Sequence, residues 1–334
     1  MTTISAPVAR LRVRLTRRLP AAVEAAFVRD FDCTIAPDDT PLDAEGLRTA
    51  LREHDVVVPT VTDRLDRAVF DGGPWRCTLL ANVGAGTDHV DIEAMQAAGI
   101  ALTNTPGVLT DDTADLALAL ILMTARRLGE GERLVRAGGW TGWRPTHHPG
   151  RTLTGAVLGI VGLGRIGQAL ARRALACGMR VQAVGTDIDA LRRVVVRDIT
   201  LGAVTPLPDL ETLLATSDIV SLHVPSSPGT RHLIDAAALA RMRQGAILVN
   251  TARGALVEED ALAAALASGH LAAAGLDVHA HEPQVHPALL ARENVVLLPH
   301  LGSATLETRT AMGMRAHANV IAFRDGRPLA DPVR

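Results

Sequence analysis

Three side chains in the carboxyl-terminal half of the chain have the types that carbonyl chemistry needs. Arg253, Glu282 and His300 each come soon after a short apolar run that is typical of a buried strand. An arginine can hold a carboxylate through two parallel hydrogen bonds and polarise the carbonyl group next to it. A histidine can deliver a proton near neutral pH, and a glutamate beside it favours the protonated imidazole and fixes the ring. Each residue alone also fits an ordinary role, as a surface arginine, a helix-capping acid or a strand-end histidine.

A glycine-rich stretch upstream of this trio has the spacing of a dinucleotide-binding turn. Residues 157–161 form an apolar run typical of a strand buried on both faces, and Gly162, Gly164 and Gly167 follow it as G-x-G-x-x-G. Gly162 would make the tight turn, Gly164 would let backbone N–H groups approach a pyrophosphate, and Gly167 would let the next helix pack close to the strand. A helical stretch and a second apolar run, 181–184, follow the glycines. This strand–turn–helix–strand order distinguishes a dinucleotide-binding turn from a glycine turn without a ligand.

The trio and the glycine turn together predict one kind of reaction. The carboxyl ends of parallel strands converge on the ligand crevice, so the trio is expected near a bound nicotinamide. That combination suits hydride transfer to a 2-oxo acid, in which Arg253 holds the carboxylate and His300 gives the proton that the new alkoxide needs. A second glycine-containing loop, 83–87, also follows an apolar run. Its N–H groups could face a small anion such as a substrate carboxylate, or it could be a turn without a ligand.

Apolar runs alternate with helical stretches along the chain, which predicts an α/β fold with parallel, doubly wound sheets. The expected strands cover residues 13–15, 33–35, 56–58, 77–82, 100–103, 157–161, 181–184, 219–224, 246–250, 272–277 and 295–298. The expected helices cover residues 20–27, 43–52, 63–70, 91–98, 168–177 and 258–268. A longer helix from Thr110 to Met123 and beyond is apolar on nearly all sides and is therefore expected to be buried, within the chain or against a second subunit. Residues 138–149 are expected to form an irregular loop.

The composition excludes several classes of function. A formal net charge of −2 over 334 residues gives no reason to expect binding to nucleic acid or to an anionic membrane. The chain has no tyrosine, so phenolic acid–base chemistry is excluded. Cys33, Cys77 and Cys177 are scattered, which predicts neither a disulfide framework nor a thiolate zinc site and favours a reducing, cytoplasmic compartment. Neither a membrane-spanning helix nor a signal peptide is expected.

Several motifs resemble the signatures of the D-isomer-specific 2-hydroxyacid dehydrogenases. They are NTARG at 250–254, GLDV at 275–278, HEP at 281–283 and LPHLGSAT at 298–305. Three others, TRRLP at 16–20, NTPGVLT at 104–110 and WTGWRP at 140–145, are similar to the glyoxylate/hydroxypyruvate reductase branch. The resemblance runs from about Val13 to Gly326, and implies a Rossmann nucleotide-binding domain (106–302) inserted in a flavodoxin-like substrate domain (1–105 and 303–334).

The resemblance also assigns roles to residues. It implies Arg253 as the carboxylate anchor, His300 as the general acid/base and Glu282 as its partner. It implies a homodimer with the long helix at the interface. Further implied substrate contacts are the backbone N–H groups of Val83, Gly84 and Ala85. Trp140 and Trp143 are expected to form a wall of the site or an interface contact. The alternative is that these two tryptophans only fill a hydrophobic core. The implied cofactor contacts are Thr113, Gly162, Leu163, Gly164, Arg165, Ile166, Gly167, Thr186, Asp187, His223, Val224, Pro225, Thr230, Thr251, Ala252, Arg253, Asp277, His300 and Gly302.

Two departures from the family pattern bear on specificity. Asp187 stands two residues after the position where NAD-preferring relatives usually have an acid, and its carboxylate would repel a 2′-phosphate. NAD(H) is therefore favoured over NADP(H), although Arg192 and Arg193 could reach such a phosphate. His279 stands where relatives often have an aromatic residue; it is close to His281, but no third ligand is evident, so no metal site is predicted.

The expected activity is reduction of glyoxylate, hydroxypyruvate or a similar short 2-oxo acid to the D-2-hydroxy acid. A phosphite-type anion dehydrogenase is one alternative. A cofactor-sensing, corepressor-like binding protein is another, because the same fold has that role in some relatives, although those tend to carry extra tails. Formate oxidation is disfavoured, since formate enzymes of this superfamily typically have glutamine in the place of Glu282.

Overall fold

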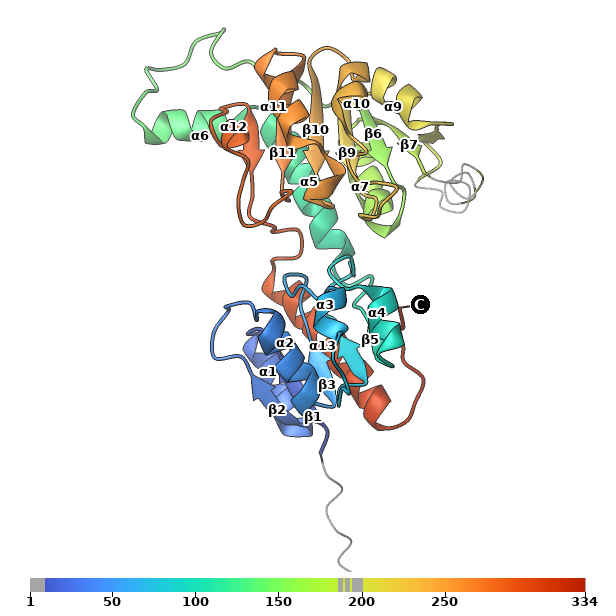
Figure 1. Cartoon of the computed structure of the whole chain (residues 1–334). Helices are drawn as coiled ribbons and strands as arrows, with labels where there is room; N and C mark the ends of the chain where they lie inside the picture. The colour runs from blue at the N-terminus through green and yellow to red at the C-terminus, as the bar shows by residue number, and fades with distance from the viewer. Residues whose placement is uncertain (1–9, 186–188, 190–192, 194–200, 334) are drawn as a thin grey trace, which may run out of the picture. The chain divides into compact units, whose positions relative to one another are not determined.

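The chain divides into two compact units, each with its own parallel sheet (Figure 1). The computed structural model describes residues 10–185, 189, 193 and 201–333. Unit 1 comprises Met1–Leu109 and Thr305–Arg334, and unit 2 comprises Thr110–Ala304. Unit 2 is therefore inserted in the sequence of unit 1. The functional boundaries expected from the sequence, after residues 105 and 302, remain a proposal.

Unit 1 contains a five-stranded parallel sheet in the order β2-β1-β3-β4-β5. Its strands are β1 (Arg12–Leu15), β2 (Asp32–Ile35), β3 (Val56–Val58), β4 (Leu79–Ala81) and β5 (Ala101–Thr103). Its helices are α1 (Ala21–Asp30), α2 (Ala44–Glu53), α3 (Arg67–Phe70), α4 (Ile92–Ala97) and α13 (Leu306–Arg324). The strand order reverses between β1 and β3, as in flavodoxin-like sheets. The last helix packs against the first so closely that a Cβ on Gly313 would lie 2.6 Å from Val23 Cγ1.

The helix expected over residues 63–70 starts later than predicted. Asp63 is fully buried, and its Oδ2 accepts hydrogen bonds from Thr16 Oγ1 at 2.7 Å and from the Thr60 N–H at 2.7 Å. These bonds hold residues 60–63 in a turn, so the helix α3 begins only at Arg67. Tertiary contacts of one buried carboxylate here override a local helical pattern.

Unit 2 contains a seven-stranded parallel sheet in the order β12-β11-β10-β9-β6-β7-β8. Its strands are β6 (Val157–Val161), β7 (Arg180–Val184), β8 (Val204–Pro206), β9 (Ile219–Leu222), β10 (Ala246–Asn250), β11 (Leu271–Leu276) and β12 (Val295–Leu297). Its helices are α5 (Thr110–Ala125), α6 (Leu128–Arg136), α7 (Arg165–Ala176), α9 (Leu210–Thr216), α10 (Ala236–Arg241), α11 (Glu259–Ala267), α12 (Pro287–Leu290) and the 3₁₀ turn η2 (Gly254–Leu256). The order reverses between β6 and β9, so a ligand crevice is expected at the carboxyl ends of these strands.

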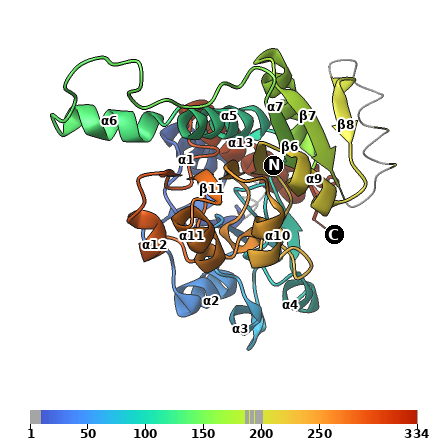
Figure 2. The same cartoon turned by 90° about the horizontal axis from the view of Figure 1, so that it is seen from above.

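Two layers of helices bury the sheet of unit 2. Figure 2 shows α5 and α7 on one side and α10 and α11 on the other. Every residue of β6, β9 and β10 is buried, as expected for central strands with helices on both faces. Among the described residues, no helix combines the length and the apolar character that crossing a membrane would require.

The long helix expected from Thr110 ends at Ala125, and a separate helix follows. Arg127 has a φ of 54°, in the left-handed region, which stops α5 and starts α6. Helix α6 has no buried residue, and Leu128 and Val135 are 48% and 59% exposed. The loop expected over 138–149 contains neither helix nor strand. This corner of unit 2 extends away from the sheet in both views (Figures 1 and 2).

Candidate active site

The three glycines of the turn after β6 have different geometries. Gly162 has a φ of +96°, and a Cβ there would lie 2.8 Å from the carbonyl oxygen of His223, at the end of β9. A Cβ on Gly167 would lie 2.2 Å from the Gly162 carbonyl oxygen, so the helix can approach the strand only with glycine. A Cβ on Gly164 would meet nothing within 4 Å. The turn therefore needs two of its glycines for packing and leaves open space at the third.

The start of α7 presents unpaired backbone donors at this turn. The first hydrogen bond of the helix runs from the Gln168 N–H to the Gly164 oxygen at 2.9 Å. Among the described residues, no acceptor pairs with the N–H groups of Arg165, Ile166 and Gly167. Such donors at the amino end of a 12-residue helix favour an anion. These residues fit the pyrophosphate of a dinucleotide.

Further implied cofactor contacts follow β9 and β10. The hydroxyl of Thr251 is buried and finds no hydrogen-bond partner in the described part of the chain. His223 Nε2 lies 2.8 Å from Ser221 Oγ, and burial of its ring lowers the pKa of His223 to about 4, so it is neutral. The Thr230 hydroxyl donates to the Pro225 carbonyl at 2.8 Å and fixes the loop that contains both. These polar groups follow β9 and β10, the two strands next to the β6–β9 reversal on the side of β9.

The residues expected to set cofactor preference follow β7 in the sequence. Thr186, Asp187 and Arg192 lie outside the described residues. Arg193 is described, and its side chain is exposed.

The structure brings His300 and Glu282 into direct contact. Nδ1 of His300 lies 2.8 Å from Oε2 of Glu282, and each side chain is 33% exposed. Burial alone would raise the pKa of Glu282, but the hydrogen bond and charge of His300 and the N–H of His279 outweigh it, so the pKa of Glu282 is lowered. An ionised carboxylate can only accept, so Nδ1 carries the hydrogen of this bond and Nε2 is left for a substrate. The pair can therefore hold and release a proton at Nε2.

Asp277 holds the turn that contains His300. It is fully buried, and its two carboxylate oxygens accept hydrogen bonds from the N–H groups of Leu301 at 2.6 Å and Gly302 at 2.8 Å. Burial raises the pKa of Asp277, and these two N–H groups oppose that shift. The Thr113 hydroxyl, at the start of α5, donates to the Gly302 carbonyl at 2.8 Å. His300 itself has a φ of 56°, so this frame keeps it in a conformation that few non-glycine residues adopt.

Arg253 lies on the turn after β10. The Asn250 side chain donates to the Arg253 carbonyl at 2.8 Å and accepts from the Ala252 N–H at 3.0 Å, which fixes the turn. A Cβ on Gly254 would lie 2.0 Å from the carbonyl carbon of His279, so the turn packs directly on the segment that leads to Glu282. The sequence interpretation did not identify Asn250 as a positioning residue. A polar residue at the end of an otherwise apolar strand is the signal that could have identified it.

His279 connects the segments of Glu282 and His300. Its N–H donates to Glu282 Oε1 at 3.0 Å, and its Nε2 lies 3.0 Å from the Leu298 carbonyl oxygen, two residues before His300. Its ring is buried, and Nδ1 lacks a partner among the described residues. No group of three or more histidine, cysteine, aspartate or glutamate side chains in the described residues is arranged to bind a metal ion.

The loop after β4, in unit 1, is held by two asparagines. Asn82 donates to the carbonyls of Gly84 and Gly86 at 3.1 and 3.0 Å, and Asn104 donates to that of Ala85 at 2.8 Å. The carbonyls are thereby occupied, and the N–H groups of Gly84 and Ala85 have no acceptor in the described part of the chain. The implied role of Val83 needs correction, because its N–H already donates to the Pro59 carbonyl at 2.8 Å.

The two loop tryptophans lie on the surface of this chain. Trp140 is 54% exposed and Trp143 is 80% exposed. This exposure excludes the alternative that the two tryptophans only fill a hydrophobic core.

Comparisons with known proteins agree with this geometry. Residues 118–302 match the family described as D-isomer specific 2-hydroxyacid dehydrogenase, NAD binding domain. The glyoxylate reductase of Thermococcus litoralis is 41% identical over 319 residues, which cover 94% of each chain. A solved NADPH-dependent glyoxylate/hydroxypyruvate reductase from Sinorhizobium meliloti, in complex with NADP and malonate, has a TM-score of 0.84 and 32% identity and covers 97% of each chain. The holo D-mandelate dehydrogenase of Rhodotorula graminis has a TM-score of 0.83 and 32% identity and covers 98% of each chain.

The doubly wound sheets, the glycine turn and the His300–Glu282 pair define a dinucleotide-dependent α/β oxidoreductase. Its cofactor is a nicotinamide dinucleotide. The chain belongs to the D-isomer specific 2-hydroxyacid dehydrogenase family.

Proposed function

We propose that this enzyme reduces glyoxylate, hydroxypyruvate or a similarly short 2-oxo acid to the D-2-hydroxy acid. The observation that carries the proposal is the 2.8 Å contact between His300 Nδ1 and Glu282 Oε2, at the same edge of the sheet as the glycine turn. It supplies a proton donor where hydride transfer needs one. The relative with 41% identity is a glyoxylate reductase, whereas the D-mandelate dehydrogenase is 32% identical, which favours a short acid.

His300 and Glu282 divide the proton chemistry between them. When bound, the reduced nicotinamide supplies the hydride that adds to the carbonyl carbon. The Nε2–H of protonated His300 donates to the carbonyl oxygen and gives up its proton as the alkoxide forms. Glu282 stays ionised and stabilises the positive imidazole before transfer. Asp277 and Thr113 act indirectly, because they hold the turn on which His300 sits.

Arg253 is the proposed anchor for the substrate carboxylate. Its guanidinium can make two parallel hydrogen bonds with a carboxylate, which fixes the orientation of the neighbouring carbonyl. The N–H groups of Gly84 and Ala85 are proposed as further hydrogen-bond donors to the substrate carboxylate. Within the loop, the carbonyls of these two residues accept hydrogen bonds from Asn82 and Asn104, which leaves the N–H groups to face a ligand.

NAD(H) is the proposed preferred cofactor. The support comes from the sequence, in which Asp187 follows β7 and the adjacent Thr186 is not an arginine. The S. meliloti relative is NADPH-dependent, so the branch contains both preferences. Measuring kcat/KM with NADH and NADPH tests this proposal; a clear preference for NADPH would contradict it and direct attention to Arg192 and Arg193.

A homodimer is the proposed assembly. Helix α6 buries none of its residues, and Leu128, Val135, Trp140 and Trp143 are all exposed on it or on the following loop. Aromatic residues exposed beside aliphatic ones are typical of protein interfaces. A reducing, cytoplasmic location also remains a proposal, which is supported by three cysteines that are free of disulfides.

A substrate panel tests the proposed reaction. The purified enzyme is mixed with NADH or NADPH and with glyoxylate, hydroxypyruvate or phenylglyoxylate, and with NAD⁺ and phosphite as a separate arm. Nicotinamide absorbance gives the rates, and chiral chromatography gives the enantiomer of glycerate formed from hydroxypyruvate. We expect rapid reduction of the two short acids and D-glycerate as product. Activity with phosphite alone, or L-glycerate as product, would overturn the proposal.

A further inference from the structure

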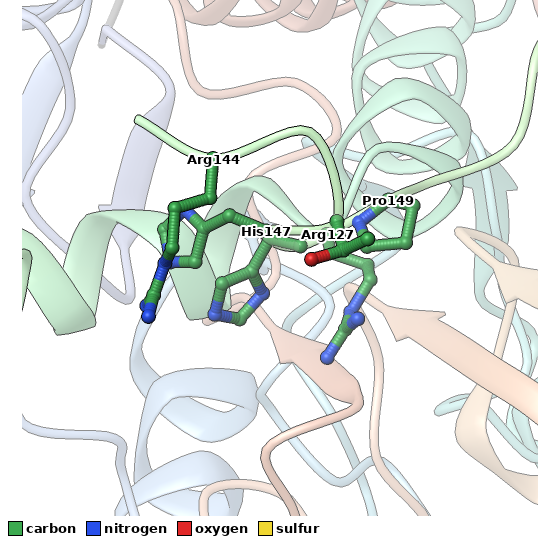
Figure 3. A pocket seen from close by; sticks show the side chains of 6 residues that line it. Arg127, Arg144, His147 and Pro149 are labelled. Atoms are coloured by element: carbon green, nitrogen blue, oxygen red, sulfur yellow. The ribbon is translucent and has the colours of Figure 1, made fainter. Parts of the chain in front are cut away.

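A cationic cavity lies in unit 2 at the corner between α5, α6 and the loop that follows them. Figure 3 shows Arg127, Arg144 and His147 with their nitrogen-bearing ends turned to the same side of the chain. These three line a cavity of about 360 Å³ together with Thr146, His148 and Pro149. None of the six belongs to the glycine turn or to the His300–Glu282 pair.

The backbone fixes the wall of this cavity. The loop returns to the end of α5 at Gly150, where a Cβ would lie 2.6 Å from the Ala125 carbonyl oxygen. The next N–H, of Arg151, donates to that same oxygen at 2.7 Å. Arg127 and His148, on opposite sides of the loop closure, have φ values of 54° and 48°. Closely packed backbone therefore holds residues 144–149 against the start of α6.

The charges around the cavity do not balance. Arg127 pairs with Glu130, with Nη2 and Oε2 2.6 Å apart, and Glu130 is the one carboxylate that pairs with a lining residue in the described part of the chain. The exposed Arg144 has no ion-pair partner among the described residues. His147 and His148 pack edge to face with ring centroids 4.8 Å apart, and Nδ1 of His148 is buried without a described partner. The cavity thus combines two guanidinium groups and two imidazoles with one carboxylate.

We propose that this cavity binds a small oxyanion with at least two negative charges, of the phosphate-ester or polycarboxylate type. A guanidinium presents a planar fork of N–H donors that matches two oxygens of such an anion. The imidazoles and the Thr146 hydroxyl add single donors around the same space. The volume admits an anion larger than chloride.

This site is distinct from the place of the chemistry. Helix α5 has 16 residues and is therefore about 24 Å long. The cavity lies at its carboxyl end, whereas Thr113, near its amino end, contacts the turn of His300. The anion site does not depend on the proposed function, so the two proposals can fail separately.

Calorimetry of the cofactor-loaded enzyme tests the proposal. Saturating reduced cofactor fills the glycine turn, and inorganic phosphate and citrate are then titrated separately, so that the stronger one identifies the ligand type. In R144Q we expect binding to weaken about tenfold or more, which is about 1.4 kcal/mol. The matched control is R136Q, which removes one charge from an exposed arginine of α6 outside the cavity. In R253K the binding that depends on Arg144 should persist even where binding at the substrate anchor is weakened, which separates the two sites.

Three results would overturn the proposal. The first is that neither anion binds the wild type. The second is that both anions bind R144Q as tightly as they bind the wild type. The third is that R144Q weakens self-association without any detectable anion binding, which would assign the cavity to a side chain of a second copy of this chain.

Discussion

Nδ1 of His300 lies 2.8 Å from Oε2 of Glu282, while the other oxygen of the same carboxylate accepts the His279 N–H at 3.0 Å. Glu282 is therefore held from two sides and cannot rotate away without losing one of these bonds. The ring of His300 takes its orientation from a fixed acceptor, so its Nε2 has a defined direction. This is the arrangement that a general acid requires, since proton transfer depends first on geometry.

Replacing Glu282 by Gln should move the pH profile of reduction. The pKa of Glu282 lies below its ordinary value, so at neutral pH the wild-type residue is an anion that stabilises the protonated imidazole needed for reduction. In E282Q that anion is absent, and the fall of reductive kcat/KM with rising pH should occur at lower pH than in the wild type. E293Q, which alters an exposed ion pair with Arg133, is the control. A profile in E282Q that matches the wild type would contradict the coupling.

Replacing Arg253 by Lys should raise the KM for the 2-oxo acid. Lysine keeps the charge but loses the planar fork, and a charge-assisted bond contributes about 1.5–3 kcal/mol, or roughly tenfold to a hundredfold in binding. Cofactor affinity, measured by nicotinamide fluorescence, should change little. R243K, in an exposed ion pair with Asp218, is the matched control. An equal loss of substrate and cofactor binding would make Arg253 a structural residue.

Replacing His279 by Phe should reduce both stability and kcat. The ring would still fill its buried position, but the Leu298 carbonyl would lose the donor 3.0 Å away, which costs about 1 kcal/mol. The segment leading to His300 should then be less well fixed. H279Q retains an amide donor and should recover part of both losses. Thermal unfolding and steady-state kinetics make the comparison, and unchanged values in H279F would show that this bond is dispensable.

Replacing Trp143 by Ala should weaken the proposed dimer without unfolding the chain. The side chain is 80% exposed, so its removal takes little from the core of unit 2. A buried interface tryptophan typically contributes about 2 kcal/mol or more, roughly a thirtyfold change in the dissociation constant. Analytical ultracentrifugation at several concentrations measures it, with L290A, at another exposed apolar position, as the control. A W143A dimer as stable as the wild type would remove the loop from the interface.

The sequence predicted the elements that apolar runs and glycines define. The fully buried strand β6 and the G-x-G-x-x-G turn were predictable because a central strand needs a continuous apolar run and each glycine has a separate steric reason. The order in which Arg253, Glu282 and His300 follow successive strands was equally visible. The contacts among these three residues could not be predicted from the sequence, because the hydrogen bond between residues 282 and 300 depends on the turn that Asp277 holds.

Other features depend on tertiary contacts that local sequence does not encode. The break between α5 and α6 occurs at Arg127 in a left-handed conformation, with no glycine or proline at that position to signal it. The strand β8 has only three residues and ends in Pro206, so it lacks a strand pattern. Val83 was expected to offer a free N–H, but its pairing with Pro59 is a contact between residues 24 positions apart that only the fold reveals.

The most direct test of the account is the reductive kcat/KM of H300A with glyoxylate or hydroxypyruvate. Removing the imidazole removes the proton donor, so we expect a loss of about 10²–10⁴-fold, the usual contribution of a positioned acid. Cofactor affinity should be retained, since the glycine turn is unchanged. Near-wild-type reduction by a folded H300A enzyme that still binds its cofactor would contradict the assignment of His300 as the acid.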